Sequence, residues 1–177
     1  MKYLIISIIL IVGVSCESNK SDGIEAGIIN SNIIYKELIP PMQISNPGKD
    51  SLDLNNDSKY DIIFIKSPIP LLTGFGIKSE VIKKTNTQVI ISEVNDYPDS
   101  LNYKDLINDS RNWSGNEEIS YILQSYTCNS NTCPSIGNFI NVTNKYVGFK
   151  IGKSFGWIVL DNGEWIDLNI KGFAITK

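Results

Sequence analysis

The chain has 177 residues, of which 42% are hydrophobic and 20% charged, a balance typical of a globular protein long enough to bury one sizeable core. Its formal charge of -3 and its scattered lysines provide no basic stripe for a phosphate backbone, which excludes nucleic acid as a partner. Because the sequence contains no histidine, the commonest general base and imidazole metal ligands are also excluded, and any catalysis would fall to carboxylates, Lys, Tyr or a bound metal.

The N-terminus indicates export. Lys2 precedes an uncharged run, Tyr3–Val14, which is shorter than the roughly 20 apolar residues of a membrane-spanning helix but typical of a signal peptide. The sequence GVSC ending at Cys16 resembles the lipobox of bacterial lipoproteins, whose signal peptide is removed before the cysteine and whose thiol carries a palmitate-type lipid. The resemblance implies lipidation of Cys16 and anchoring in a membrane. A plain secretory signal, removed nearby, is the alternative.

These features divide the chain into three parts. Residues 1–15 are predicted to be the signal peptide, 16–32 a lipid-anchored tether and 33–177 a single folded domain. The polar, turn-forming segment Glu17–Gly23 favours a flexible tether. Glu17, directly after Cys16, resembles the residue found in lipoproteins sent on to the outer membrane. We therefore expect an exported lipoprotein of the outer membrane or cell surface.

The folded part begins with short apolar runs separated by turn-forming residues, a pattern typical of strands. The run Ile33–Ile39 is closed by Pro40-Pro41, and Asp61–Lys66 is apolar on both faces, as expected of a central strand. Ser79–Lys84 and Gln88–Glu93 flank a three-residue turn and are predicted to pair as an antiparallel hairpin.

The segment Asp53–Phe64, DLNNDSKYDIIF, places oxygen-bearing side chains at alternate positions before an apolar strand. Asp53, Asn55, Asp57, Lys59 (through its carbonyl) and Asp61 occupy positions one, three, five, seven and nine of a cation loop, and oxygen ligands suit calcium better than magnesium. We therefore predict a structural calcium site that holds the following strand in place. A solvated polar turn is the alternative.

Val94–Glu118 holds many polar and turn-forming residues and is predicted to be a long surface excursion with at most one helical turn near Leu101–Ile107. Beyond it, Ile119–Thr127 is predicted to be a strand. Cys128 and Cys133 are the two cysteines left if Cys16 is lipidated, and an even count in an oxidising compartment predicts a disulfide. Free thiols remain the alternative, and a zinc site would need more ligands than the chain contains.

The C-terminal third is predicted to be a meander. Val147, Phe149 and Ile151 share one strand face, and Phe155, Trp157 and Val159 share a face of the next strand across a turn at Gly152; both rows are expected to face the core. A further turn is predicted at Asp161–Gly163. Because no window has a sustained helical period, the sequence predicts an all-β fold, a single-domain antiparallel β-sandwich.

Four segments resemble a loosely defined group of uncharacterised secreted bacterial β-proteins. In such proteins an aspartate-rich loop leads into a strand, and a GFK-like strand followed by a YGW-like strand closes the sheet. The resemblance spans most of the mature chain and implies a β-sandwich, with no activity attached. The loop also resembles thrombospondin-type and dockerin-type calcium loops, although Ser58 stands where those loops have glycine and Phe64 where an EF-hand has its glutamate. The four segments are Ile33–Leu38, Asp53–Phe64, Leu101–Trp113 and Tyr146–Leu160.

Two functions follow from the sequence. The first is a non-catalytic binding or scaffold module on the cell surface, with a glycan or a surface protein as partner and with Trp113 and Trp165 as the candidate aromatic platform. The second is a small glycosidase-like hydrolase that acts on extracellular glycan through two carboxylates. Candidate carboxylates for the hydrolase crowd one region, although crowded carboxylates also suit a solvated loop. They are Asp96, Asp99, Asp105, Asp109, Glu117 and Glu118.

Overall fold

The computed structural model describes residues 23–71, 74–128, 132–163 and 167–177. The predicted signal peptide, the predicted lipidation site Cys16 and Trp165 lie outside these residues. The described residues form strands, turns and loops and no helix, which confirms the all-β prediction.

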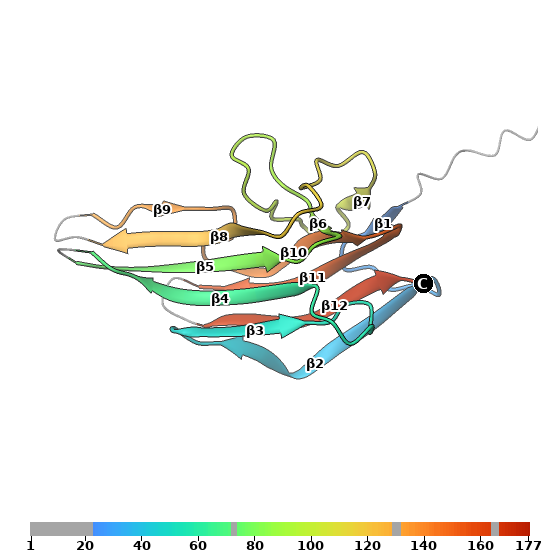
Figure 1. Cartoon of the computed structure of the whole chain (residues 1–177), viewed down its shortest axis with the longest axis horizontal. Helices are drawn as coiled ribbons and strands as arrows, with labels where there is room; N and C mark the ends of the chain where they lie inside the picture. Colours follow the sequence, from blue (N-terminus) through green and yellow to red (C-terminus); the bar gives the residue numbers. More distant parts are fainter. Residues whose placement is uncertain (1–22, 72–73, 129–131, 164–166) are drawn as a thin grey trace, which may run out of the picture.

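Two five-stranded antiparallel sheets pack face to face (Figure 1). The first sheet has the order β2-β12-β11-β10-β6 and the second has the order β3-β4-β5-β8-β9. A separate two-stranded ribbon pairs β1 with β7. The strands are β1 (Gly23–Glu25), β2 (Ile33–Ile44), β3 (Gly48–Leu52), β4 (Ile62–Ile69), β5 (Phe75–Lys83), β6 (Thr87–Val89), β7 (Leu106–Asn108), β8 (Ile119–Cys128), β9 (Ser135–Ile136), β10 (Val142–Ile151), β11 (Ser154–Asn162) and β12 (Leu168–Thr176).

The core between the two sheets is built by alternation along the strands. Ile62 and Phe64 on β4 alternate with half-buried residues, and Ile158 and Leu160 on β11 face them from the other sheet. Burial of this apolar surface is the main source of stability, at about 25 cal/mol for each Å² removed from water. The interior is therefore that of a β-sandwich, as the strand pattern predicts.

Several predicted boundaries of strands and turns are wrong, among them the end of β6, which lies at Val89 and not at Glu93. The first predicted strand was expected to end at Pro40-Pro41, but β2 runs through both prolines to Ile44. Because β2 lies at the edge of its sheet, a proline without an N–H group need not break a ladder on its open side. The predicted turn at Asp161–Gly163 is also misplaced, since β11 continues to Asn162.

The predicted hairpin of Ser79–Lys84 with Gln88–Glu93 does not form. β5 pairs with β4 and β8 in the second sheet, whereas β6 pairs with β10 in the first. The turn between them therefore carries the chain from one sheet to the other. The spacing identified two strands and a turn, but a short turn joins neighbouring strands of one sheet or crosses between two sheets equally well.

A second apolar cluster covers the outer face of the first sheet, on the side away from the sandwich core. Trp157 on β11 packs there against side chains of β1 and of the excursion, including Ile24, Leu101 and Ile107, all of which are buried. The predicted surface excursion and helical turn are therefore wrong for this part of Val94–Glu118, which contains β7. β1, at Gly23–Glu25, lies within the segment predicted to be the tether.

The two predicted apolar rows of the C-terminal hairpin face opposite clusters. Val147 and Phe149 on β10 point into the sandwich core, whereas Phe155 and Trp157 on β11 point into the outer cluster. Phe149 lies directly across from Gly156, where a side chain would collide with the ring: an added Cβ would be 2.1 Å from Phe149 Cζ. The ladder thus combines a large residue with a glycine.

Candidate functional site

The aspartate-rich loop joins β3 to β4 and is fixed at both ends. The N–H of Asp61 donates to the carbonyl of Leu52 at 2.9 Å, and the N–H of Lys84 donates to the carbonyl of Asp61 at 2.9 Å. Leu54, inside the loop, is buried in the sandwich core. The loop therefore starts and ends on rigid strands, and its polar residues are held over the end of the core.

The loop's side-chain oxygens accept hydrogen bonds from its own backbone. Asp53 accepts through both carboxylate oxygens, from the N–H of Asp57 at 3.1 Å and from that of Ser58 at 2.8 Å. Asn55 Oδ1 accepts from the N–H of Asp57 at 3.0 Å, and Asp57 Oδ1 accepts from the N–H of Lys59 at 2.9 Å. The alternate side chains at positions one, three and five are thus turned inward over the loop.

Two non-glycine residues of the loop have left-handed backbone conformations. The φ angles are 61° for Asn56 and 69° for Ser58. Asn adopts this conformation readily, whereas a residue such as Ser is strained there by about 1–2 kcal/mol. Ser58 is the residue that stands in place of glycine in the calcium loops that this segment resembles, so the backbone at this position is the kind that glycine suits.

Asp61 differs from the other loop carboxylates because it is buried, with 8% of its surface exposed. Its Oδ2 accepts from the N–H of Leu54 at 2.8 Å. Burial, the largest cause, raises the pKa of Asp61, and the charges of Asp57 and Asp53 raise it further, although hydrogen bonds from the backbone oppose them. The folded loop therefore disfavours the ionised form of this carboxylate unless a positive charge compensates it.

The loop brings the predicted ligand residues onto one short stretch of backbone. Among the described residues, however, no three carboxylate, thiolate or imidazole side chains are placed so that they could hold a metal ion. The predicted ligand set also contains the Asn55 amide and the Lys59 carbonyl. An ion would require the three aspartates to close around it.

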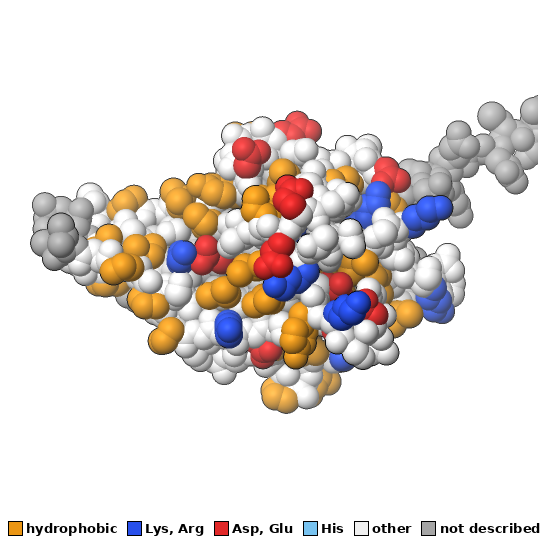
Figure 2. All heavy atoms as spheres, viewed as in Figure 1, with side chains coloured by type: hydrophobic (Ala, Val, Ile, Leu, Met, Phe, Trp, Pro, Cys, Tyr) orange, Lys and Arg blue, Asp and Glu red, His pale blue; other side chains and the backbone are white. Residues whose placement is uncertain are grey.

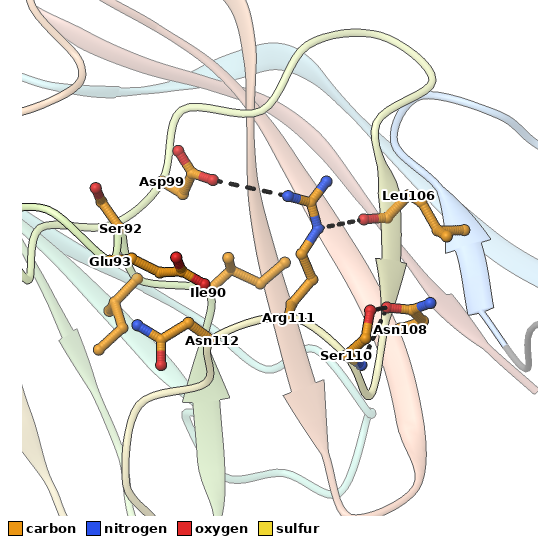
Figure 3. Close-up of a pocket in the computed structure, with 10 residues that line it drawn as sticks. Ile90, Ser92, Glu93, Asp99, Leu106, Asn108, Ser110, Arg111 and Asn112 are labelled. Atoms are coloured by element: carbon orange, nitrogen blue, oxygen red, sulfur yellow. Dashed lines mark hydrogen bonds and ion pairs between the residues drawn. The ribbon is translucent and has the colours of Figure 1, made fainter.

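A second feature is a cleft of about 600 Å³, which we call the Arg111 cleft (Figure 3). Backbone hydrogen bonds hold its walls together: the N–H of Ile91 donates to the carbonyl of Asn112 at 2.9 Å, and the N–H of Asp99 donates to the carbonyl of Ile90 at 2.9 Å. Three chain segments therefore frame a preformed site. Its principal lining residues are Ile90, Ser92, Glu93, Asp99, Arg111 and Asn112.

Arg111 is fixed at one end of its guanidinium group and open at the other. Its Nε donates to the carbonyl of Leu106 at 2.6 Å, and its Nη1 faces an oxygen of Asp99 at 4.0 Å, too far for a hydrogen bond. Glu93 and Asn112 lie on the opposite side of Ile90 in Figure 3, and their side chains have no partner among the described residues. The cleft thus holds charged and amide groups whose hydrogen-bonding capacity is largely unused.

Of the predicted aromatic platform, only Trp113 is described. Its ring lies 5.9 Å from that of Phe155 with an interplanar angle of 29°, and its indole N–H donates to the carbonyl of Asn108 at 3.0 Å. Trp113 is half-buried against the outer cluster. It packs as a structural residue and does not line the Arg111 cleft.

The carboxylates that suggested a hydrolase are dispersed. Asp109 pairs with Lys150, Glu118 pairs with Lys84 at 2.8 Å, and an oxygen of Asp105 accepts from the N–H of Asn102 at 2.7 Å. Only Asp99 of the six lines the Arg111 cleft. Crowding in the sequence therefore reflects separate contacts of an exposed segment.

The predicted disulfide is confirmed, because Cys128 and Cys133 are joined and close a small loop after β8. The surface is otherwise mixed in charge. Figure 2 shows acidic and basic side chains interspersed over one face, with acidic groups on the loops above β6 and β10 and mostly hydrophobic or uncharged atoms toward the tip of β8 and β9. No helix among the described residues has the length and apolar character needed to cross a membrane.

Of the residues that line the Arg111 cleft, the sequence singled out only Asp99, as one of the candidate carboxylates, and it missed the others. Glu93, Arg111 and Asn112 come from two ends of the excursion and form no motif with a fixed spacing. One signal was available: Arg111 is the only arginine among the 16 basic residues of the chain. Arginine presents a planar fork of donors that lysine lacks, so a single arginine among lysines marks a position where geometry is needed.

Comparison with protein-family models, with curated proteins and with solved structures gives no match. The resemblance to secreted bacterial β-proteins and to lipoproteins is therefore still a prediction from the sequence.

Proposed function

We propose that the protein is an exported, lipid-anchored binding or scaffold module whose β3–β4 loop binds calcium. The lipobox-like segment that ends at Cys16 supports the anchor, and the outer membrane or cell surface is the location that its neighbour Glu17 favours. The β-sandwich supplies a rigid body on which loops can present a binding surface. The proposed role of the ion is structural.

One observation carries the calcium proposal. Asp53, Asn55 and Asp57 alternate along the loop and turn their oxygens inward, while Ser58 has the left-handed backbone at the position of the usual glycine. Hard cations prefer carboxylate, amide and carbonyl oxygens, which are the groups that this loop offers. The buried Asp61 forms no ion pair with a lysine or arginine of the described residues, and a bound ion would supply a compensating positive charge.

The calcium proposal is tested by thermal unfolding of the full-length protein in detergent, with millimolar calcium and with chelator. An ion that binds only the native state stabilises it by about 2.7 kcal/mol at a hundredfold excess over the dissociation constant. Asp57→Ala should remove the calcium effect. As a matched control, Asp50→Ala removes an exposed carboxylate of β3 outside the loop and should retain it. Equal midpoints of the parent protein in both solutions would refute the proposal.

The anchor is tested separately by Cys16→Ala. Because the proposed lipid attaches to the Cys16 thiol, this variant should appear in the soluble fraction while the parent protein fractionates with membranes. Cys133→Ala is the matched control, since it opens the disulfide of the folded domain and should leave the membrane association intact. A Cys16→Ala variant that fractionates with membranes as the parent does would contradict the anchor.

A further inference from the structure

We propose that the Arg111 cleft binds a neutral saccharide. This inference deepens the proposed binding role by naming a ligand class and a site, and it rests on that role without depending on the calcium loop. The volume of the Arg111 cleft, about 600 Å³, lies within the range of small-molecule sites, about 300–1,000 Å³.

The charges of the cleft favour a neutral ligand. One guanidinium, that of Arg111, stands against two carboxylates, those of Asp99 and Glu93, so the lining carries a formal charge of -1. A phosphate or carboxylate on Arg111 would lie close to the oxygen of Asp99, which is 4.0 Å from Nη1. A cation near Asp99 would in turn meet the guanidinium. An uncharged ligand avoids both repulsions.

The hydrogen-bonding groups of the cleft match hydroxyl groups. A hydroxyl both donates and accepts, and the cleft offers the guanidinium donors of Arg111, the carboxylate acceptors of Glu93 and Asp99, and the carboxamide of Asn112, which does both. Planar forks such as guanidinium and carboxylate can each engage two adjacent oxygens, which suits neighbouring hydroxyls on a sugar ring. Leu106, which is 38% exposed, supplies apolar surface for the ring's C–H groups.

The cleft is also preorganised. Arg111 is held at its Nε by the carbonyl of Leu106, and the strand-like bridge between Ile90 and Trp113 fixes the cleft floor to the outer apolar cluster. Binding therefore need not order the segment that carries the arginine, which lowers the entropic cost of association. The single arginine of the chain lies where this rigidity can be used.

The test is titration of the full-length protein in detergent with short neutral oligosaccharides of the gluco-, manno-, xylo- and N-acetylglucosamine series, followed by calorimetry. Inorganic phosphate, citrate and an oligouronate serve as anionic probes. We expect at least one neutral series to bind, and Arg111→Ala to weaken that binding by about tenfold or more, because a hydrogen bond with a charged group is lost. Glu93→Gln should weaken it less. Lys153→Ala, which removes a positive charge from an exposed turn, is the matched control and should bind as the parent does.

Arg111→Lys separates geometry from charge. It keeps the positive charge but loses the planar fork, so it should resemble Arg111→Ala. The saccharide proposal is overturned if no neutral series binds, if an anionic probe binds more tightly than every neutral one, or if Arg111→Ala and Lys153→Ala have equal effects. The calcium response of the same samples is measured in parallel, so that a failure of the cleft is distinguished from a failure of the loop.

Discussion

The effect of replacing Asp61 with Asn on stability should depend on calcium: the variant should be at least as stable as the parent without the ion and less stable with it. The variant keeps an oxygen that can accept the 2.8 Å hydrogen bond from the N–H of Leu54, but it removes a buried charge beside Asp53 and Asp57. The balance of these contributions already includes the backbone hydrogen bonds and still raises the pKa of Asp61, so the fold favours the neutral group. In chelator, Asp61→Asn should therefore be at least as stable as the parent.

In calcium the order should invert. The parent gains about 2.7 kcal/mol at a hundredfold excess of the ion over its dissociation constant, and the variant, which lacks one of the proposed carboxylate ligands, loses most of this gain. For a domain of this size the loss corresponds to a lower unfolding midpoint by about 5–11 °C, at 2–4 °C for each kcal/mol. The assay is thermal unfolding of both proteins in calcium and in chelator.

The pH dependence of stability is a second test of the role of Asp61. Because the pKa of Asp61 is higher in the folded than in the unfolded state, its protonated form contributes to the free energy of unfolding. This contribution is fully present below the unfolded pKa, about 4, and is lost as the pH rises through the folded pKa. In chelator this loss should disappear in Asp61→Asn. In calcium the stabilisation of the parent should grow over the same window, as the carboxylate ionises. An equal destabilisation by Asp61→Asn in calcium and in chelator would show that Asp61 acts only as a structural acceptor, and the reasoning would fail.

Two further predictions concern the backbone. Ser58→Gly should stabilise the protein by about 0.5–1 kcal/mol, because relief of strain at a φ of 69° exceeds the entropic cost of glycine. The control Asn56→Gly should be stabilised less, because Asn adopts the left-handed conformation readily. Urea unfolding that ranks the two variants in the opposite order would contradict the strain argument. Gly156→Ala should lower the free energy of unfolding by about 2–3 kcal/mol, since the new Cβ would lie 2.1 Å from Phe149 Cζ and 2.4 Å from the carbonyl oxygen of Ala174. Adding Phe149→Leu should restore part of the loss. A Gly156→Ala variant with the parent's unfolding midpoint would argue against this register.

The fold class was predictable because strands and turns leave local marks. Alternating residues such as Val147 and Phe149, with Gly152 at the following turn, define a strand and its hairpin without knowledge of the rest of the chain. The local sequence does not show which sheet a strand belongs to. Gln88–Glu93 has the pattern of a strand, but its partner β10 begins more than 50 residues later, so the short turn before it suggested the wrong neighbour.

The candidate loop and the Arg111 cleft differ in the same way. Asp53, Asn55 and Asp57 lie close in sequence, so their alternation alone indicated a cation loop. Glu93 and Arg111 line one cleft only because the excursion folds back, and Leu101 and Ile107 of that excursion are buried although most residues around them in the sequence are polar. A segment whose few apolar residues pack against a distant strand cannot be distinguished by composition from an exposed loop.

The pairing of β2 with β12 joins opposite ends of the folded chain. Ile33 lies across from Thr176, a separation of 143 residues (176 minus 33). During synthesis, which proceeds from the N-terminus, β2 must wait for β12, its partner in the sheet among the described residues, and long-range pairings of this kind form slowly. β12 is also a partner of β11, so loss of this nine-residue strand would leave β2 unpaired and would expose one edge of β11, which keeps β10 on its other side. A chain from which β12 has not yet emerged therefore cannot complete its first sheet, and the arrival of β12 is the step that pairs β2 and covers the open edge of β11.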